Sequence, residues 1–434
     1  MHIVIAGAGK VGFNLARTLC IGHNVTVIDT NAQALQRLQE SLDILPLHGD
    51  VENSATYEKF VKKEIDFFIA VTNIDNVNLV ATLVAGTTLK IKKSFVRVAQ
   101  PFLAQEAIAE KLSIDKMILP INLTAQTVAS LLAYPQANNV KFFKDTSHRL
   151  ISVMASQDFH AQKFTLQNVA VVGIERNKIF FIPKQDEMIY PNDLVYFFGD
   201  EEEIKTVCPH IELHTIAAIR RCVVYGAEPL GVNIARDLLS MGCDVKIVEK
   251  DLTLCEDADE ALHGKVDILN AKYETHNIFE DEGLDNADIF ISATRNDEFN
   301  IIKSLEAKER GIKKVVAINN DMEYYSLMHS LGIIVVRGPK TSAYNAIMDE
   351  ISSSGVVTQK SFCGAKGVVF MKKIFSNRIK KIKPIKGEGH CLFIIRDEKI
   401  FAFLDKELLQ EGDIVSAFCV IDKSAKVKQW IYEL

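Results

Sequence analysis

The sequence predicts an α/β protein with two tandem domains that each contain a doubly wound parallel sheet, and each is followed by a small α+β domain. Three observations predict this fold. Apolar strands alternate with helical stretches, a glycine-rich turn follows the first strand, and the whole pattern occurs twice. At 434 residues, the chain is also longer than one hydrophobic core normally supports.

Landmarks of the first half recur in the second half at a nearly constant offset. The glycine turn that starts at Gly7 recurs at Gly226, which is 219 residues further on. Asp29, at the end of the second predicted strand, matches Glu249 at an offset of 220. We therefore interpret the chain as two copies of one unit.

Each copy opens with a strand, the glycine turn, a helix and a second strand that ends in an acidic residue. In the first copy the helix is predicted over 11–19 and the strands over 3–6, 25–28, 67–71 and 95–98. In the second copy the strands are predicted over 222–225, 245–248, 289–292 and 315–318. This order makes both domains Rossmann-like.

Short β-rich runs with turn residues between them follow each of these domains. They lie at 150–155, 169–173, 178–182 and 194–198, and again at 367–371, 391–396, 400–403 and 414–418. We therefore predict four domains. Their bounds are 1–135 and 219–354 for the Rossmann-like domains, and 136–212 and 355–434 for the small α+β domains.

The glycine turn carries the chemistry of a nucleotide site. Its first glycine makes the tight turn, the second lets a pyrophosphate approach the backbone, and the third lets the helix pack on the strand. Asp29 follows at the distance where a carboxylate accepts the ribose hydroxyls, and its charge disfavours the 2′-phosphate of NADP. The predicted cofactor is NAD(H), with ATP or ADP as the alternative, and the loop residues are Gly7, Ala8, Gly9, Lys10, Val11 and Gly12.

Four further residues follow predicted strands or lie in them, close to the edge of the sheet where ligands bind. Asp50 follows His48 and Gly49 after a further short strand between 25–28 and 67–71, where a loop can contact the adenine side or be a plain turn. Thr72 and Asn73 lie at the end of the strand 67–71, and Arg97 in the strand 95–98 can reach a phosphate or form a salt bridge. Lys10 is equally compatible with phosphate contact and with a solvated helix start, because no P-loop motif surrounds it.

The second copy keeps only part of this pattern. Glu228 replaces the middle glycine and brings a negative charge to the phosphate position, while Ala317 is aligned with Arg97. Ala271 and Lys272 replace Gly49 and Asp50. We expect this site to be weaker, altered or purely structural. The candidate residues that persist are Gly226, Gly231, Glu249 and Thr294.

Composition and charge exclude several other classes of protein. The net charge of −6 is spread along the chain without a basic block, so nucleic acid is not an expected partner. The eight cysteines form no C-x-x-C pair, and we predict neither a disulfide nor a metal site. The first residues run directly into a strand without a signal-peptide pattern, which predicts a cytoplasmic protein.

One segment, residues 117–140, carries no charge over a length that could span a membrane. Its prolines and polar residues are unfavourable in hydrocarbon. We predict a soluble helix whose apolar face, formed by Val128, Leu131 and Leu132, is available for packing against another subunit.

The order of these motifs resembles the N-terminal domains of the regulators of potassium conductance, the RCK family. The doubled arrangement is similar to the peripheral subunits of Trk potassium-uptake systems, and the stretches 191–199 and 411–415 resemble the closing strand of the RCK C-terminal domain. The resemblance implies a cytosolic homo-oligomer, a dimer or tetramer, on the inner face of the membrane. It also implies a potassium channel or transporter as partner, with NAD(H) or ATP/ADP controlling ion flux.

Two other functions remain open from the sequence. An NAD-dependent oxidoreductase is disfavoured because no Tyr is followed by Lys four positions later and neither half leaves room for a large substrate domain. Regulation of a different membrane transporter is the second alternative. We predict that the protein is not an enzyme.

Overall fold

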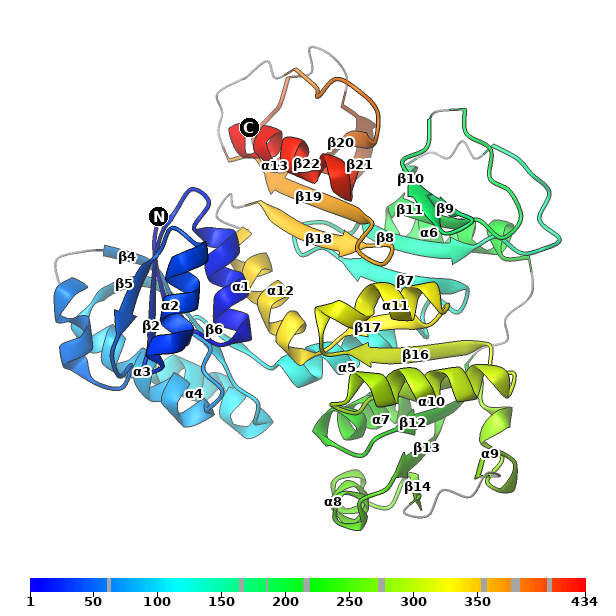
Figure 1. Cartoon of the computed structure of the whole chain (residues 1–434), viewed down its shortest axis with the longest axis horizontal. Helices are drawn as coiled ribbons and strands as arrows, with labels where there is room; N and C mark the ends of the chain where they lie inside the picture. Colours follow the sequence, from blue (N-terminus) through cyan, green and yellow to red (C-terminus); the bar gives the residue numbers. More distant parts are fainter. Residues whose placement is uncertain are drawn as a thin grey trace. The chain divides into compact units, whose positions relative to one another are not determined.

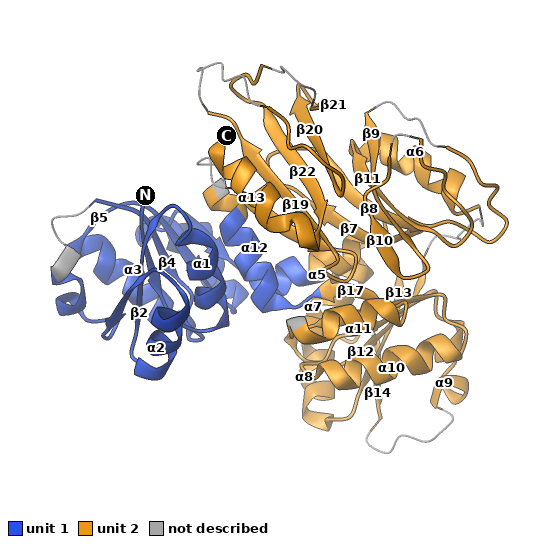
Figure 2. Ribbon diagram, turned by 45° about the horizontal axis from the view of Figure 1, so that its top comes forward, with its two compact units in different colours: residues 1–124, 337–348 blue, residues 125–336, 349–434 orange. Residues whose placement is uncertain are grey.

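The computed structural model describes residues 1–60, 64–163, 168–184, 186–213, 219–271, 278–352, 357–375, 383–403 and 408–434, so Lys272 lies outside the described residues (Figure 1). The chain divides into two compact units (Figure 2). Unit 1 comprises residues 1–124 and 337–348, and unit 2 comprises residues 125–336 and 349–434.

Unit 1 contains a six-stranded parallel sheet in the order β3-β2-β1-β4-β5-β6. The strand order reverses between β1 and β4, and ligands of such sheets bind at this switch point, outside the carboxyl ends of the strands. The strands are β1 His2–Ala6, β2 Asn24–Asp29, β3 Leu45–His48, β4 Glu64–Ala70, β5 Lys90–Arg97 and β6 Lys116–Ile118. The helices are α1 Lys10–Leu19, α2 Ala32–Ser41, η1 Ser54–Phe60, α3 Asp75–Thr88, η2 Pro101–Ala104, α4 Glu106–Lys111 and α5 Pro120–Ser130, which continues into unit 2.

The central strands of this sheet are apolar along their whole length because helices cover both faces. Residues 3–6 of β1 are all buried, as are residues 67–70 of β4. Tyr57 from η1 packs edge-on against Phe68 and is itself fully buried. Continuous apolar runs of this kind position the polar residues that follow them at one edge of the sheet.

Unit 2 repeats the parallel sheet in the order β14-β13-β12-β15-β16-β17. Its strands are β12 Arg221–Tyr225, β13 Asp244–Glu249, β14 Asp267–Asn270, β15 Ile289–Ser292, β16 Lys314–Asn319 and β17 Ile334–Arg337. The helices of this part are α7 Pro229–Ser240, α8 Leu252–Leu262, α9 Ile278–Asp281, η3 Leu284–Asn286, α10 Asp297–Glu309, η4 Met322–Tyr324, α11 Tyr325–Ser330 and α12 Pro339–Ser352, whose first part clusters with unit 1.

Unit 2 also holds two antiparallel five-stranded sheets, in the orders β10-β9-β11-β8-β7 and β18-β19-β22-β20-β21. The first consists of β7 Ala137–Phe142, β8 Arg149–Met154, β9 Val169–Arg176, β10 Ile179–Phe181 and β11 Leu194–Gly199, with α6 Glu201–Ile211. The second consists of β18 Thr358–Phe362, β19 Gly367–Lys373, β20 His390–Arg396, β21 Lys399–Ala402 and β22 Ile414–Val420, with η5 Ile421–Lys423 and α13 Ser424–Glu433.

Aromatic side chains from both antiparallel sheets form one shared core. The ring centroids of Phe198 and Phe418 are 4.8 Å apart, and those of Phe180 and Phe362 are 5.3 Å apart. All four rings belong to the same buried cluster. The predicted fold class of two parallel-sheet domains, each followed by a small α+β domain, is confirmed. The exact domain bounds predicted from the sequence stay a proposal.

The helix predicted over 117–140 is present only over 120–130, so its predicted extent was wrong. The segment contains the end of β6, the helix α5, and the start of β7, which pairs with β8. Val128 and Leu131 are buried in the chain itself, whereas Leu132 is half-buried, so most of the predicted face is not available to another subunit. An apolar helix face can pack against another subunit or against the rest of its own chain, and here it packs against its own chain. Among the described residues, no helix is both long and apolar enough to cross a membrane.

Lys314, at the start of β16, is a buried lysine whose amine caps the chain segment that follows α5. Its Nζ donates to the carbonyl oxygens of Leu131, Tyr134 and Pro135 at 3.1, 3.1 and 3.2 Å. Burial lowers the pKa of Lys314 to about 7. These three hydrogen bonds connect the second parallel sheet to the segment that leads into β7.

We expect Lys314→Met to lower the free energy of unfolding by about 2 to 4 kcal/mol, because three buried carbonyls lose their donor. The stability difference should grow as pH rises from about 7 towards 10.5, since the unfolded chain then binds a proton that the folded chain lacks. Calorimetric melts over this pH range measure both effects. Lys313→Met, at an exposed neighbouring position, is the control; equal melting of the two variants would contradict the capping role.

Candidate nucleotide-binding site

Two glycines of the first loop are required by the fold. Gly7 has φ +114°, and a Cβ there would lie 3.0 Å from the backbone nitrogen of Thr72. A Cβ at Gly12 would lie 1.9 Å from the carbonyl oxygen of Gly7, which no rearrangement of a side chain could relieve. These positions therefore need glycine for the turn itself and for the contact of α1 with β1.

Gly9 differs from both, because the fold does not require a glycine there. Its φ is −68° and its ψ is −175°, which any residue adopts, and a Cβ would meet no atom within 4 Å. It is the N-cap of α1, and no side chain caps this end of the helix. The first backbone N–H groups of α1, at the positive end of the helix dipole, are thus suited to bind a phosphate.

Asp29 supports the loop and faces the same space. One carboxylate oxygen accepts a hydrogen bond from the backbone N–H of Ala8 at 2.6 Å, and the other accepts one from Asn31 at 2.7 Å. An ionised carboxylate offers about four acceptor positions, so both oxygens can still accept ribose hydroxyls. Asp29 can therefore position the loop and bind a sugar at the same time.

Thr72 is held at the end of β4 by a fully buried amide, that of Asn78. The Asn78 side-chain oxygen accepts hydrogen bonds from the Thr72 backbone N–H at 2.8 Å and from its hydroxyl at 2.7 Å. The amide nitrogen donates to the carbonyls of Thr72 at 3.1 Å and Arg97 at 2.9 Å. This network fixes the loops after β4 and β5 relative to each other.

Arg97 is hydrogen-bonded to the same loop. One guanidinium nitrogen donates to the carbonyl of Thr72 at 2.9 Å and to the side chain of Asn73 at 3.4 Å. Its Nε is buried without a hydrogen-bond partner in the described part of the chain. Burial lowers the pKa of Arg97, with Asp75 opposing the effect. Arg97 therefore holds the Thr72–Asn73 loop and adds a partly compensated positive charge near it.

These loops surround a cavity of about 810 Å³, which we call the unit 1 cavity. Its volume lies in the range of small-molecule and cofactor sites. The predicted residues that line it are Gly7, Ala8, Gly9, Lys10, Asp29, Asp50, Thr72 and Asn73. Val11, Gly12 and Arg97 do not line it.

The sequence patterns did not indicate several other lining residues, among them Phe13, Arg37 and Val77. Arg37 and Ala34 both line the cavity and are three residues apart on α2, so they share one face of that helix. Arg37 lies on the helix that follows Asp29, on the same face as Ala34, and this position could have identified it as a cavity-lining residue from the sequence. A cation at this position adds to the attraction of the cavity for phosphate.

The second copy builds the same scaffold. Gly226 has φ +112°, a Cβ at Gly231 would lie 1.9 Å from the Gly226 carbonyl oxygen, and Glu249 accepts from the backbone N–H of Ala227 at 2.8 Å. Thr294 is bonded to the buried side chain of Asn300 as Thr72 is to Asn78. All four candidate residues of the second copy therefore lie in the same geometry as their counterparts.

Glu228 changes what this second scaffold can bind. Its carboxylate is 2.5 Å from the Nε of Arg295, which follows Thr294 after β15, and the two form an ion pair. Burial raises the pKa of Glu228, while Arg295 opposes the rise. Glu228 occupies the position of Gly9, so an anion of the chain itself lies where the first copy leaves room for a phosphate.

The alignment of Ala317 with Arg97 was wrong by one residue. In the first sheet the Asn78 amide donates to the carbonyl of Arg97, and in the second the Asn300 amide donates to that of Ile318 at 3.0 Å. Strand pairing gives the same register, so Ile318 is the counterpart of Arg97. The second copy therefore has an isoleucine at the position where the first copy has the guanidinium of Arg97.

Comparison with known proteins agrees with this doubled architecture. The TrkA-N domain model matches residues 3–120 and again residues 222–339. The chain is 28% identical to a Trk system potassium uptake protein TrkA of Halomonas elongata, over 98% of this chain and 96% of the relative. It is also 28% identical to a TrkA homolog of Archaeoglobus fulgidus, over 99% of both proteins.

Among solved structures, the fold resembles a GsuK channel bound to NAD, with a TM-score of 0.59 and 14% identity, covering 100% of this chain and 79% of the other. The GsuK RCK domain is similar, with a TM-score of 0.56 and 14% identity, covering 100% and 95% of the two chains. The two segments matched by the family model make up more than half of the sequence, and the chain therefore belongs to the TrkA-N domain family.

Proposed function

We propose that this chain is a regulatory subunit that binds NAD(H) in the unit 1 cavity and thereby controls potassium flux through a membrane channel or transporter. The observation that carries the nucleotide assignment is Gly9. It lines the cavity, and nothing in the fold requires a glycine there. The second copy accommodates Glu228 at the same place in the same scaffold, so the room above Gly9 serves a ligand.

The surrounding residues support a dinucleotide without a 2′-phosphate. The N-terminus of α1 suits the pyrophosphate, and Asp29 suits the ribose hydroxyls while repelling a 2′-phosphate. ADP and ATP share the adenosine and phosphate groups and are the alternative ligands. The GsuK channel that this fold resembles is bound to NAD. A second GsuK structure is bound to ADP; it is 15% identical, with a TM-score of 0.50 over 81% of this chain and 68% of the other.

The proposed role is binding without chemical conversion. The full-length relatives are potassium uptake proteins by name, which supports regulation of a transporter. A ligand regulates only when it binds one conformation of the assembly more tightly than another. We propose that the chain acts as a homo-oligomer on the cytoplasmic face of the membrane, attached through its transport partner.

The structure of unit 1 offers a path for such coupling. The Thr18 hydroxyl, near the end of α1, is 2.9 Å from the Tyr344 hydroxyl on α12, and the Ser342 hydroxyl on α12 is 2.8 Å from that of Thr124. The helix that would hold the phosphate thus contacts α12, which continues from unit 1 into unit 2. A ligand that shifts α1 would therefore act on a helix shared by both units.

Asp29→Asn should weaken NAD binding by about 10-fold or more, because a charged acceptor of the ribose hydroxyls becomes neutral. The same change should narrow the preference for NAD over NADP, since the repulsion of the 2′-phosphate is lost. Titration calorimetry with both dinucleotides measures the two effects. Unchanged affinity for NAD and an unchanged preference would together exclude the ribose role of Asp29.

Gly9→Glu should abolish nucleotide binding and leave folding intact, because Glu228 shows that the loop tolerates this residue. Gly86→Glu introduces the same side chain at an exposed position of α3 that does not line the cavity. Calorimetry and thermal melts should separate the variants: only the first loses the ligand, and neither unfolds. If Gly9→Glu binds NAD as tightly as Gly86→Glu does, the ligand lies elsewhere.

Deleting the gene should reduce potassium uptake at low external potassium in a strain that carries no other gene of this family. The wild-type gene should restore uptake. The Gly9→Glu gene should restore uptake that no longer responds to the nucleotide, because the regulatory ligand cannot bind. Rubidium flux measures uptake. Normal uptake in the deletion strain, or NADH oxidation at enzyme-like rates by the pure protein, would contradict the regulatory role.

A further inference from the structure

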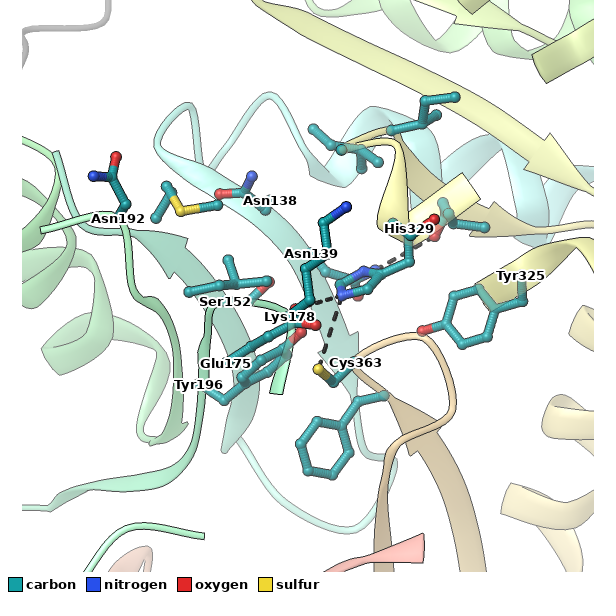
Figure 3. Close-up of a pocket in the computed structure, with 18 of the residues that line it drawn as sticks. Asn138, Asn139, Ser152, Glu175, Lys178, Asn192, Tyr196, Tyr325, His329 and Cys363 are labelled. Carbon is teal, nitrogen blue, oxygen red and sulfur yellow. Dashed lines mark hydrogen bonds and ion pairs between the residues drawn. The ribbon is translucent and has the colours of Figure 1, made fainter. Parts of the chain in front are cut away.

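Three side chains with metal-ligand chemistry meet in unit 2, in a region that the nucleotide site does not use. Glu175 lies on β9 of the first antiparallel sheet, His329 lies on α11 of the second parallel-sheet domain, and Cys363 follows β18 of the second antiparallel sheet. Figure 3 shows His329 directed towards both Glu175 and Cys363. Residues from three separate parts of the fold thus converge on one point.

The ring nitrogen Nε2 of His329 is the centre of this cluster. It lies 2.7 Å from Glu175 Oε2 and 3.8 Å from Cys363 Sγ, and the three ligand atoms lie within 4.8 Å of one another. Cys363 is 2% exposed, and the side chains of Glu175 and His329 are 11% and 17% exposed. The three groups are therefore sheltered from bulk water and close enough to share a ligand.

We propose that Glu175, His329 and Cys363 bind a zinc ion. A thiolate, an imidazole and a carboxylate are the three ligand types that zinc uses in proteins. Calcium and magnesium prefer sites made of oxygen atoms, so a site with sulfur and nitrogen ligands disfavours them.

The spacing of the atoms suits a tetrahedral ion after a small adjustment. Zinc bonds of about 2.3 Å to sulfur and about 2.0 Å to nitrogen and oxygen place neighbouring ligand atoms roughly 3.3 to 3.6 Å apart. The sulfur–nitrogen distance of 3.8 Å is close to this value, and the nitrogen–oxygen distance of 2.7 Å must widen. The ion would replace the proton between Nε2 and the carboxylate.

Zinc binding also sets the protonation states of the ligands. The Cys363 thiol releases its proton to solvent and binds as a thiolate, while a neutral His329 carries its proton on Nδ1. Burial raises the pKa of the Cys363 thiol in the metal-free protein, and a bound cation opposes this effect. Burial also raises the pKa of Glu175, but hydrogen bonds from His329 and Lys366 outweigh it and lower the value to about 2.

Glu175 divides its two oxygens between two partners. Its Oε1 accepts from the ammonium of Lys366, which also donates to the Lys178 carbonyl at 2.8 Å. Its Oε2 faces His329 and is the oxygen that would bind the ion. Lys366 holds the carboxylate in place, and its positive charge lowers the affinity of the site for a cation.

A short turn places the Cys363 thiol against the imidazole. Cys363, Gly364 and Ala365 have φ values of 51°, 59° and 70°, a run of left-handed residues that is costly outside glycine. A Cβ at Gly364 would lie 3.0 Å from the His329 ring. The close approach of this turn to His329 therefore depends on glycine.

The cluster borders a cavity of about 310 Å³, lined also by Tyr196, Asn139 and Ser152. Three protein ligands leave one tetrahedral position for water or for a small ligand in this cavity. The ion would link β9, α11 and the turn after β18, and would stabilise their arrangement by its binding free energy. Zinc binding would thus affect the conformation of unit 2 independently of the nucleotide, which is proposed to bind unit 1.

The test is a zinc titration of the full-length protein after removal of metal with a chelator. Competition with a chromophoric chelator should give one tight zinc ion per chain, and Cys363→Ser or His329→Gln should weaken it by at least about 100-fold. Loss of residues that only support the ligands already costs roughly 10- to 100-fold. Cys20→Ser, at the end of α1, is the matched control and should bind zinc as the wild type does.

Cobalt gives a readout of the ligands themselves. Cobalt-loaded wild type should show the near-ultraviolet charge-transfer band of a cobalt–thiolate bond, and Cys363→Ser should lack it. Zinc should raise the melting temperature of the wild type but not that of Glu175→Gln. No tight zinc, no thiolate band in the wild type, or unchanged zinc affinity in a folded Cys363→Ser protein would each reduce the cluster to an ion pair and overturn the proposal.

Discussion

The contact between α1 and the Gly7 carbonyl is the constraint on which the candidate nucleotide site depends. A Cβ at Gly12 would come within 1.9 Å of that oxygen, and Gly231 meets Gly226 at the same distance in the second copy. This contact places the start of α1 at the carboxyl end of β1, where the strand order reverses. The uncapped backbone N–H groups of the helix consequently face the unit 1 cavity.

The two copies separate the demands of the fold from the demands of the ligand. Both copies retain the outer glycines, the acidic residue at the end of the second strand and the buried asparagine that holds the threonine. They differ at the middle glycine, which the fold itself does not require. Glu228 and Arg295 neutralise each other at that place, so the second loop carries its own anion and cation. The second copy therefore shows that this scaffold folds without a glycine at the position of Gly9.

The fold and much of the candidate site could be predicted from the sequence because their signals are local. Parallel strands end at one edge, so residues that follow them, such as Asp29 and Thr72, had to meet. Other features depend on packing between distant segments. The burial of Val128, the role of Arg97 as a support for the Thr72 loop and the convergence of His329 with Cys363 have no local pattern. Cysteine spacing in particular cannot reveal a site that takes one ligand from each of three domains.

The energetics of regulation favour several ligand sites in one assembly. A typical coupling of about 1 to 3 kcal/mol changes an equilibrium by roughly 5- to 150-fold, whereas a switch from 1:99 to 99:1 requires about 10⁴-fold. A single nucleotide site with a typical coupling therefore cannot shift the equilibrium by the required 10⁴-fold. In a homo-oligomer the couplings of identical sites add when all chains change together, and a zinc ion that stabilises unit 2 in one arrangement would shift the starting equilibrium. If the second loop binds no ligand, the number of chains in the proposed oligomer and the proposed zinc site would set how steep the response is.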